Sequence, residues 1–145
     1  MRPHALIDSG AFIALLDASD RWHAACASAF RDIHLPLATT AAALAEVFHH
    51  QSRYPHRMRA TWGFLRTRSI TVLPIQDGDL PDLERLMLKY ADCPMDFADA
   101  TLVRLAEREG LATILTVDQD FEVYRIGGRK AFRVLPKRQQ AGGPR

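Results

Sequence analysis

The chain alternates short apolar segments with longer segments of helical periodicity, and this alternation restricts the fold more than any other feature. The apolar segments are rich in Ile, Val, Leu and Thr. Strands that alternate with helices usually form a parallel sheet with helices on both faces. We therefore predict an α/β fold in three layers, α/β/α, around a central parallel sheet of four or five strands. The expected strands lie at 5–7, 35–39, 70–73, 112–117 and, with the weakest pattern, 132–135.

The helices between these strands are indicated by the spacing of apolar residues and by residues that favour helix ends. Asp and Thr are favoured where a helix begins, and glycine where it ends. On these grounds Asp20, Thr40, Asp79 and Asp96 are expected to begin helices, and Gly110 to end one. The expected helices span 9–17, 20–31, 41–51, 56–66, 79–90 and 96–110.

The domain organisation is simple. A length of 145 residues is enough for one hydrophobic core, and no repeat or linker divides the sequence. We predict one domain over residues 1–135 and a flexible tail over 136–145, where apolar residues become rare. The apolar run at 11–16 is short and lies between Asp8 and Asp17, which is unlike a signal peptide or a membrane helix. A cytoplasmic protein without membrane attachment is expected.

Basic residues gather in two groups, although the net charge is only +2 and by itself favours a polyanionic partner weakly. Each group can be either a binding surface for a polyanion or a solvated surface without a partner. The first group is Arg53, Arg57, Arg59, Arg66 and Arg68, and the second is Arg125, Arg129, Lys130, Arg133, Lys137 and Arg138.

Acidic residues directly follow two of the expected strands. Asp8 comes after the strand at 5–7, and Asp118 comes after the strand at 112–117. Ligands of parallel sheets bind at the carboxyl ends of the strands. These two side chains are therefore expected at the same edge of the sheet.

Two further acids belong to expected helices. Glu46 lies in an otherwise apolar segment, where a carboxylate is costly to bury without a partner. Asp99 lies three residues after Asp96, so both occupy one face of their helix. Capping is the alternative role for Asp8, Asp96 and Asp118, and a solvent-facing position is the alternative for Glu46.

The sequence around these acids contains no lysine or arginine. The windows without either residue span 3–20, 33–52, 90–103 and 109–124. Carboxylates that converge without basic partners repel one another and raise one another's pKa. A hard divalent cation removes this repulsion, and oxygen ligands with room for water suit Mg²⁺ or Mn²⁺ better than zinc. The residues alone therefore indicate a Mg²⁺ or Mn²⁺ site.

Four short motifs contain these acids. They are Leu6-Ile7-Asp8-Ser9-Gly10, then Thr40 to Val47 with Glu46, then Asp96-Phe97-Ala98-Asp99-Ala100 with Leu102 and Val103, and finally Leu115-Thr116-Val117-Asp118 with Asp120-Phe121. In this order and spacing the chain resembles PIN-domain ribonucleases, in particular the VapC-type toxins of type II (VapBC) toxin–antitoxin pairs. The resemblance extends over nearly the whole chain, from 5 to about 135.

This resemblance implies the PIN fold and a metal-dependent endoribonuclease activity. It also implies that Ser9 hydrogen-bonds the acids or the substrate. Asp96 is either a further metal ligand or a helix cap, and the role of Asp120 stays open. The acidic quartet, which would hold one or two Mg²⁺ or Mn²⁺ ions, falls on Asp8, Glu46, Asp99 and Asp118.

The resemblance implies partners as well. An RNA substrate would be cleaved at its phosphodiester bonds by a water that the metal activates, and Arg53, Arg57 and Arg59 are candidates for phosphate contacts. A VapB-like antitoxin would hold the toxin inactive by covering its groove, and homodimerisation is expected. The alternative is a non-catalytic module that keeps the fold and binds RNA or protein. Cation-dependent RNA cleavage separates the two.

Overall fold

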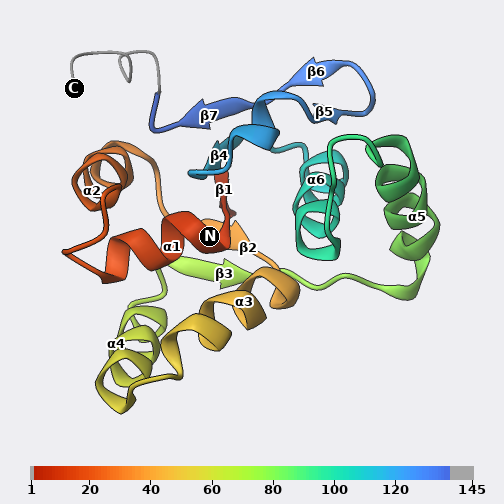
Figure 1. Cartoon of the computed structure of the whole chain (residues 1–145). Coiled ribbons are helices and arrows are strands. Elements are labelled where there is room, and N and C mark those ends of the chain that lie inside the picture. Colours follow the sequence, from red (N-terminus) through yellow and green to blue (C-terminus); the bar gives the residue numbers. More distant parts are fainter. Residues whose placement is uncertain (1, 138–145) are drawn as a thin grey trace.

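A computed structural model describes residues 2–137, in which helices cover both faces of a parallel sheet (Figure 1). The order of the strands in the sheet is β3-β2-β1-β4-β7, and every neighbouring pair is parallel. The predicted parallel sheet is confirmed, and the segment with the weakest pattern forms an edge strand. The strands are β1 (Ala5–Ile7), β2 (Leu37–Thr39), β3 (Ile70–Val72), β4 (Thr113–Leu115) and β7 (Arg133–Leu135).

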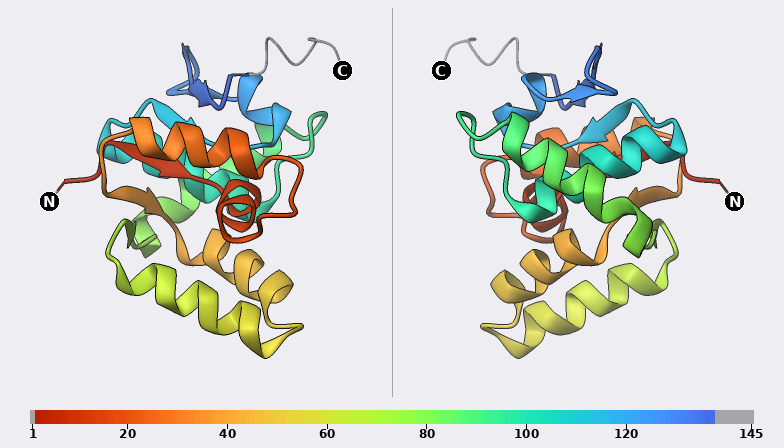
Figure 2. Two further views of the ribbon diagram at one scale, coloured as in Figure 1. Left: turned by 90° about the vertical axis from the view of Figure 1, so that its left-hand side faces the viewer. Right: turned by 90° about the vertical axis from the view of Figure 1, so that its right-hand side faces the viewer.

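Two hydrophobic clusters lie on opposite faces of this sheet. Successive residues of a strand point to opposite faces, and accordingly Leu6 packs in one cluster while Ile7 packs in the other. Figure 2 views the molecule from these two sides, with α1 and α2 in front in one view and α5 and α6 in the other. The three-layer prediction is therefore confirmed. The helices are α1 (Ser9–Leu16), α2 (His23–Asp32), α3 (Ala41–Gln51), α4 (Pro55–Arg66), α5 (Leu80–Lys89) and α6 (Phe97–Glu109).

At three of the five predicted helix ends, the predicted residue caps the helix as expected. Thr40 accepts a hydrogen bond from the backbone N–H of Ala43, and Asp96 accepts one from Asp99. Gly110 adopts the left-handed conformation, with φ at 71°, that ends α6.

The prediction for Asp20 was wrong, whereas Asp79 is the N-cap residue of α5 as predicted but does not cap the helix with its side chain. The carboxylate of Asp20 accepts a hydrogen bond from the backbone N–H of Trp22, which forms a turn, and α2 begins only at His23. Asp79 makes no side-chain capping bond to α5. It instead accepts a hydrogen bond from the backbone N–H of Gln76, before the short 3₁₀ helix η1 (Asp77–Asp79), and it binds arginines of α6.

The C-terminal part contains structure that the sequence did not indicate. After the 3₁₀ helix η2 (Gln119–Glu122), strands β5 (Arg125–Ile126) and β6 (Lys130–Ala131) form an antiparallel hairpin. Of the predicted tail, Pro136 is buried, and residues 138–145 lie outside the described residues. Among the helices of residues 2–137, none has the length and apolar character to cross a membrane.

Candidate metal centre

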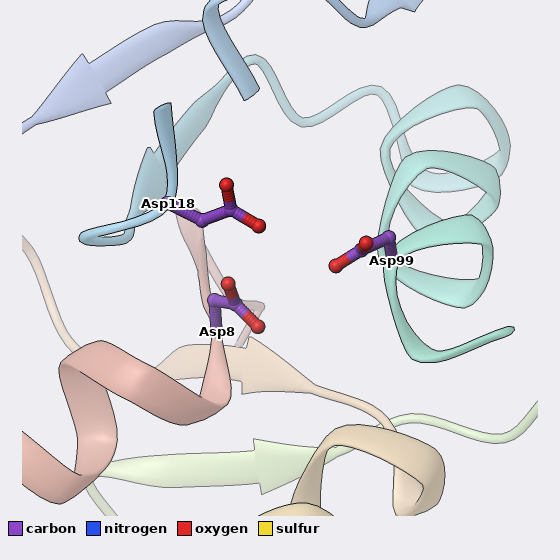
Figure 3. A group of neighbouring side chains, drawn as sticks. All are labelled: Asp8, Asp99 and Asp118. Carbon is purple, nitrogen blue, oxygen red and sulfur yellow. The ribbon is translucent and has the colours of Figure 1, made fainter. Parts of the chain in front are cut away.

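Three carboxylates from separate parts of the chain meet at the carboxyl end of the sheet. One oxygen each of Asp8, Asp99 and Asp118 lies within 4.8 Å of the others. Asp8 follows β1 and Asp118 follows β4, and these strands are neighbours in the sheet. Asp99 comes from the first turn of α6 and faces the two strand ends (Figure 3). The structure thus brings together three members of the predicted quartet.

Asp8 and Asp118 are connected through a buried threonine. One oxygen of Asp8 accepts a hydrogen bond from the backbone N–H of Ser9 at 2.7 Å, and the other accepts the Thr116 hydroxyl at 3.0 Å. The same Thr116 oxygen accepts the backbone N–H of Asp118 at 3.0 Å. Asp118 itself accepts the backbone N–H of Asp120 at 2.9 Å. Both acids therefore cap local structure and also belong to the cluster, so the two predicted roles are compatible.

Asp99 is held by a reciprocal cap and by a tyrosine. Its carboxylate accepts the backbone N–H of Asp96 at 3.2 Å, while Asp96 accepts the backbone N–H of Asp99 at 2.8 Å. The fully buried Tyr124 donates its hydroxyl to Asp99 at 3.4 Å. Burial, and then the negative charge of Asp99, raise the pKa of Tyr124 well above its usual range, so the phenol stays a hydrogen-bond donor.

Sequence reasoning missed Thr116 and Tyr124. Thr116 lies two residues before Asp118, which is the strand spacing that places two side chains on one face, so its position was a usable signal. Tyr124 follows η2 in a region of irregular backbone, and nothing in its neighbours indicates a contact with Asp99.

Glu46 lies beside the three clustered acids and is linked to them by Ser9. The Ser9 hydroxyl donates to Glu46 at 2.8 Å, and the Ser9 backbone N–H donates to Asp8. Glu46 is exposed on α3, and Asp96 is exposed at the start of α6. Desolvation raises the pKa of Glu46, the Ser9 hydrogen bond opposes this, and the nearby Asp96 carboxylate raises it further. Glu46 and Asp96 thus form an outer edge of the acidic site.

The electrostatics of the inner cluster favour a bound cation. Desolvation, opposed by the hydrogen bonds from Ser9 and Thr116, raises the pKa of Asp8 to about 6. Desolvation, together with the charges of Asp96 and Asp8, raises the pKa of Asp99 to about 8. Within residues 2–137, no basic side chain forms an ion pair with Asp8, Asp99, Asp118 or Glu46. Buried oxygen donors without basic partners fit Mg²⁺ or Mn²⁺.

The predicted arginine contacts with a substrate are spatially separate from the acids. Arg53 lies in the turn between α3 and α4, and Arg57 and Arg59 lie on α4. The guanidinium of Arg57 lies over the ring of Tyr54, 5.0 Å from its centre. Helix α4 packs on α3 and lies at the lower edge of the molecule in Figure 1, away from β4.

The sequence matches the PIN domain family over residues 5–127. Because this match covers most of the chain, the chain belongs to the PIN domain family. A comparison with curated protein sequences finds no match.

Solved structures share the fold, among them the following two. The sarcin–ricin loop cleaving toxin VapC20 of Mycobacterium tuberculosis superposes with a TM-score of 0.72 at 17% identity, covering 82% of this chain and 93% of that one. The VapBC2 complex of Rickettsia felis, bound to a DNA fragment from its promoter, gives a TM-score of 0.65 at 10% identity, covering 90% of this chain and 96% of that one. At these identities the likeness concerns the fold.

Proposed function

We propose that this protein is a metal-dependent endoribonuclease and the toxin of a VapBC-type toxin–antitoxin pair. The observation that carries the proposal is the convergence of Asp8, Asp99 and Asp118 without a basic partner among the described residues. Membership of the PIN family and the likeness to VapC20 support the same conclusion.

In this proposal Asp8, Asp99 and Asp118 hold Mg²⁺ or Mn²⁺, and Glu46 completes the acidic set from the edge. The chemistry supplied by such a cation would be a lowered pKa of a water and stabilisation of the charge that develops on the scissile phosphate. The protein's own contribution is positioning: Thr116 fixes Asp8 relative to Asp118, and Tyr124 holds Asp99.

Several partners follow from the proposal. Arg53, Arg57 and Arg59 would contact phosphates of the RNA away from the cleaved bond, and an RNA substrate implies action in the cytoplasm. A VapB-like antitoxin would cover the acidic site, and the protein would form a homodimer. The likeness to the VapBC2 complex of Rickettsia felis supports an antitoxin partner. Phe12 is 1% exposed and belongs to the core, so its side chain does not contribute to a dimer face.

The test is cleavage of total cellular RNA by the purified protein, followed by mapping of the cut sites. We expect cleavage with Mg²⁺ or Mn²⁺ and none with EDTA. Asp8→Asn and Asp99→Asn should each lower the rate by on the order of 10³-fold, because each removes an anionic ligand of the cation. Asp82→Asn is the matched control, because Asp82 pairs with arginines of α5 and α6.

Cleavage that persists in EDTA would reject the mechanism. RNA binding without cleavage in either cation would instead support the non-catalytic module. Folding of each variant can be checked by circular dichroism, and Asn at position 99 keeps an oxygen that can accept the backbone N–H of Asp96.

A further inference from the structure

An apolar pocket lies next to the acidic site, between the first turns of α3 and α6. Its volume is about 290 Å³, and the residues that line it are Ala41, Ala42, Pro74, Ile75, Phe97 and Thr101. In Figure 1 the segment that leaves β3 passes the lower end of α6, and Pro74 and Ile75 belong to this segment. Phe97 is 48% exposed, so an aromatic residue of the pocket is accessible to solvent.

The chemistry of the pocket is apolar and uncharged. Among the described residues that line it, Thr101 carries the one polar side-chain group. That hydroxyl donates to the Ala98 carbonyl at 2.7 Å and pairs with the Thr40 hydroxyl at 2.8 Å, so its hydrogen bonds are already made inside the protein. A ligand for this pocket must therefore offer an apolar or aromatic surface.

The pocket and the acidic site use residues of the same two helices, α3 and α6. On α6, Phe97 is the residue after Asp96. On α3, Ala42 lies four residues before Glu46, which places both on one side of the helix. The nearby Asp96 carboxylate raises the pKa of Glu46. The pocket therefore adjoins the outer edge formed by Glu46 and Asp96, and Ser9 links Glu46 to Asp8 of the inner cluster.

We propose that the pocket receives one unpaired base of the RNA substrate, which stacks on Phe97 while its neighbouring phosphate lies at the acids. This inference rests on the proposed function, because an RNA that is cut at the acids must continue over an adjoining surface. The carboxylates of Glu46 and Asp96 disfavour a phosphate at the pocket itself. An uncharged base with a flat face fits there, and unpaired bases commonly stack on aromatic side chains. Phe97 then contributes to the choice of the cleaved bond.

The test uses a short single-stranded RNA that contains one bond cleaved by the wild-type protein. In a series of such RNAs, each nucleotide near the bond is replaced in turn by an abasic ribose. We expect Phe97→Ala to lower kcat/KM for the intact RNA by roughly 5- to 150-fold, the usual range for loss of one base–aromatic stack. Phe97→Tyr should keep the activity, and Phe97→Leu, which is apolar but lacks a ring, should lose most of it.

The decisive result is that the effects of Phe97→Ala and of one abasic position on kcat/KM do not add. One abasic position should lower kcat/KM of the wild type by a similar factor and cause no further loss in Phe97→Ala. Leu88→Ala is the control, because Leu88 is 70% exposed on α5 and does not line the pocket. Losses that add at every abasic position would overturn the base contact. The base contact would also be overturned if Phe97→Ala cleaves RNA normally but binds an antitoxin less tightly. The same holds if Phe97→Ala cleaves normally and light scattering shows a changed oligomeric state.

A binding measurement separates failure of this inference from failure of the proposed function. The cleavage-deficient Asp99→Asn protein is mixed with the same RNA carrying 2-aminopurine at the sensitive position. Stacking should quench its fluorescence, and the quench should disappear in Asp99→Asn/Phe97→Ala. Absence of cleavage by the wild type would reject the nuclease proposal alone. Equal quenching in both variants would reject the pocket proposal alone.

Discussion

Two buried acids associated with opposite ends of α6 have similar burial and opposite electrostatics. Asp99 in the first turn is 8% exposed, and Asp79, which contacts the second half of the helix, is 4% exposed. Asp79 lies 2.9 Å from Arg104 and 2.7 Å from Arg108. Its pKa is lowered by the hydrogen bond from the Gln76 backbone and also by these two arginines, whereas desolvation and neighbouring carboxylates raise the pKa of Asp99.

This contrast shows that burial does not identify an acid that binds a cation. What separates the two acids is the charge of the groups that face them. The arginines of α6 and α5 compensate Asp79, Asp82 and Glu107 within the protein. Asp99 faces Asp8 and Asp118 instead. The first arrangement connects α5 to α6, and the second leaves negative charge for a ligand.

The largest effect on stability is expected where the compensated acid is removed. Asp79→Ala leaves Arg104 and Arg108 without their shared partner and should lower the free energy of unfolding by about 2–3 kcal/mol. Asp82→Ala should cost less than about 1 kcal/mol, because its ion pairs are more exposed. Urea unfolding measures both. A loss at Asp79 no greater than that at Asp82 would show that the network adds little to stability.

Removal of the charge of Asp99, which has no basic partner, is expected to increase stability rather than lower it. In EDTA at pH 8, Asp99→Asn should raise the free energy of unfolding by about 1–2 kcal/mol, because it removes a buried negative charge that lacks a basic partner. Thermal unfolding should show this as a higher Tm. Saturating Mn²⁺ should stabilise the wild type and not the variant. An Asp99→Asn protein that is less stable than the wild type in EDTA would contradict this account.

The stability contributed by the acidic cluster and the stability contributed by Asp79 should depend on pH in opposite directions. The folded-state pKa values of Asp8 and Asp99, about 6 and about 8, lie above the ordinary value of 3.8. Between pH 4 and pH 8 the folded state therefore binds more protons than the unfolded state, and the cation-free protein loses stability as pH rises. Asp79 has a lowered pKa, so its contribution is lost as pH falls below about 4. Tm measured across pH in EDTA, for wild type and Asp99→Asn, tests the first trend.

The sequence predicted the sheet and the acidic site, but it did not predict the ion pairs of Asp79. The central strands β1, β2 and β4 were recognisable because they are almost completely buried and therefore mostly apolar, and Asp8 and Asp118 follow strand ends. The pairing of Asp79 with arginines 25 and 29 residues away could not be read from local spacing, and Asp79 was taken for a cap. The hairpin of β5 and β6 was missed because its strands have two residues each, and half of these residues are charged.

The smallest effect is expected from a substitution that disturbs the packing around Asp8 and Asp118. Opposite charges assemble the Asp79 network, but the acidic cluster depends on close packing of the elements that carry it. A Cβ added at Gly10, two residues after Asp8, would lie 2.8 Å from a methyl group of Val117, which directly precedes Asp118. The glycine therefore allows α1 to approach the end of β4.

Gly10→Ala should lower the rate of RNA cleavage by about tenfold and stability by about 1 kcal/mol, because the clash moves Asp8 and Asp118 apart. Gly63→Ala on α4 is the control, since the added Cβ meets only an Arg66 side-chain atom at 3.7 Å, and alanine favours the helix. Val117→Ala should restore activity in the Gly10→Ala background by removing the methyl group. If it does not, the contact between these two residues is not what positions the acids, and the hydrogen bonds of Thr116 would have to hold the cluster alone.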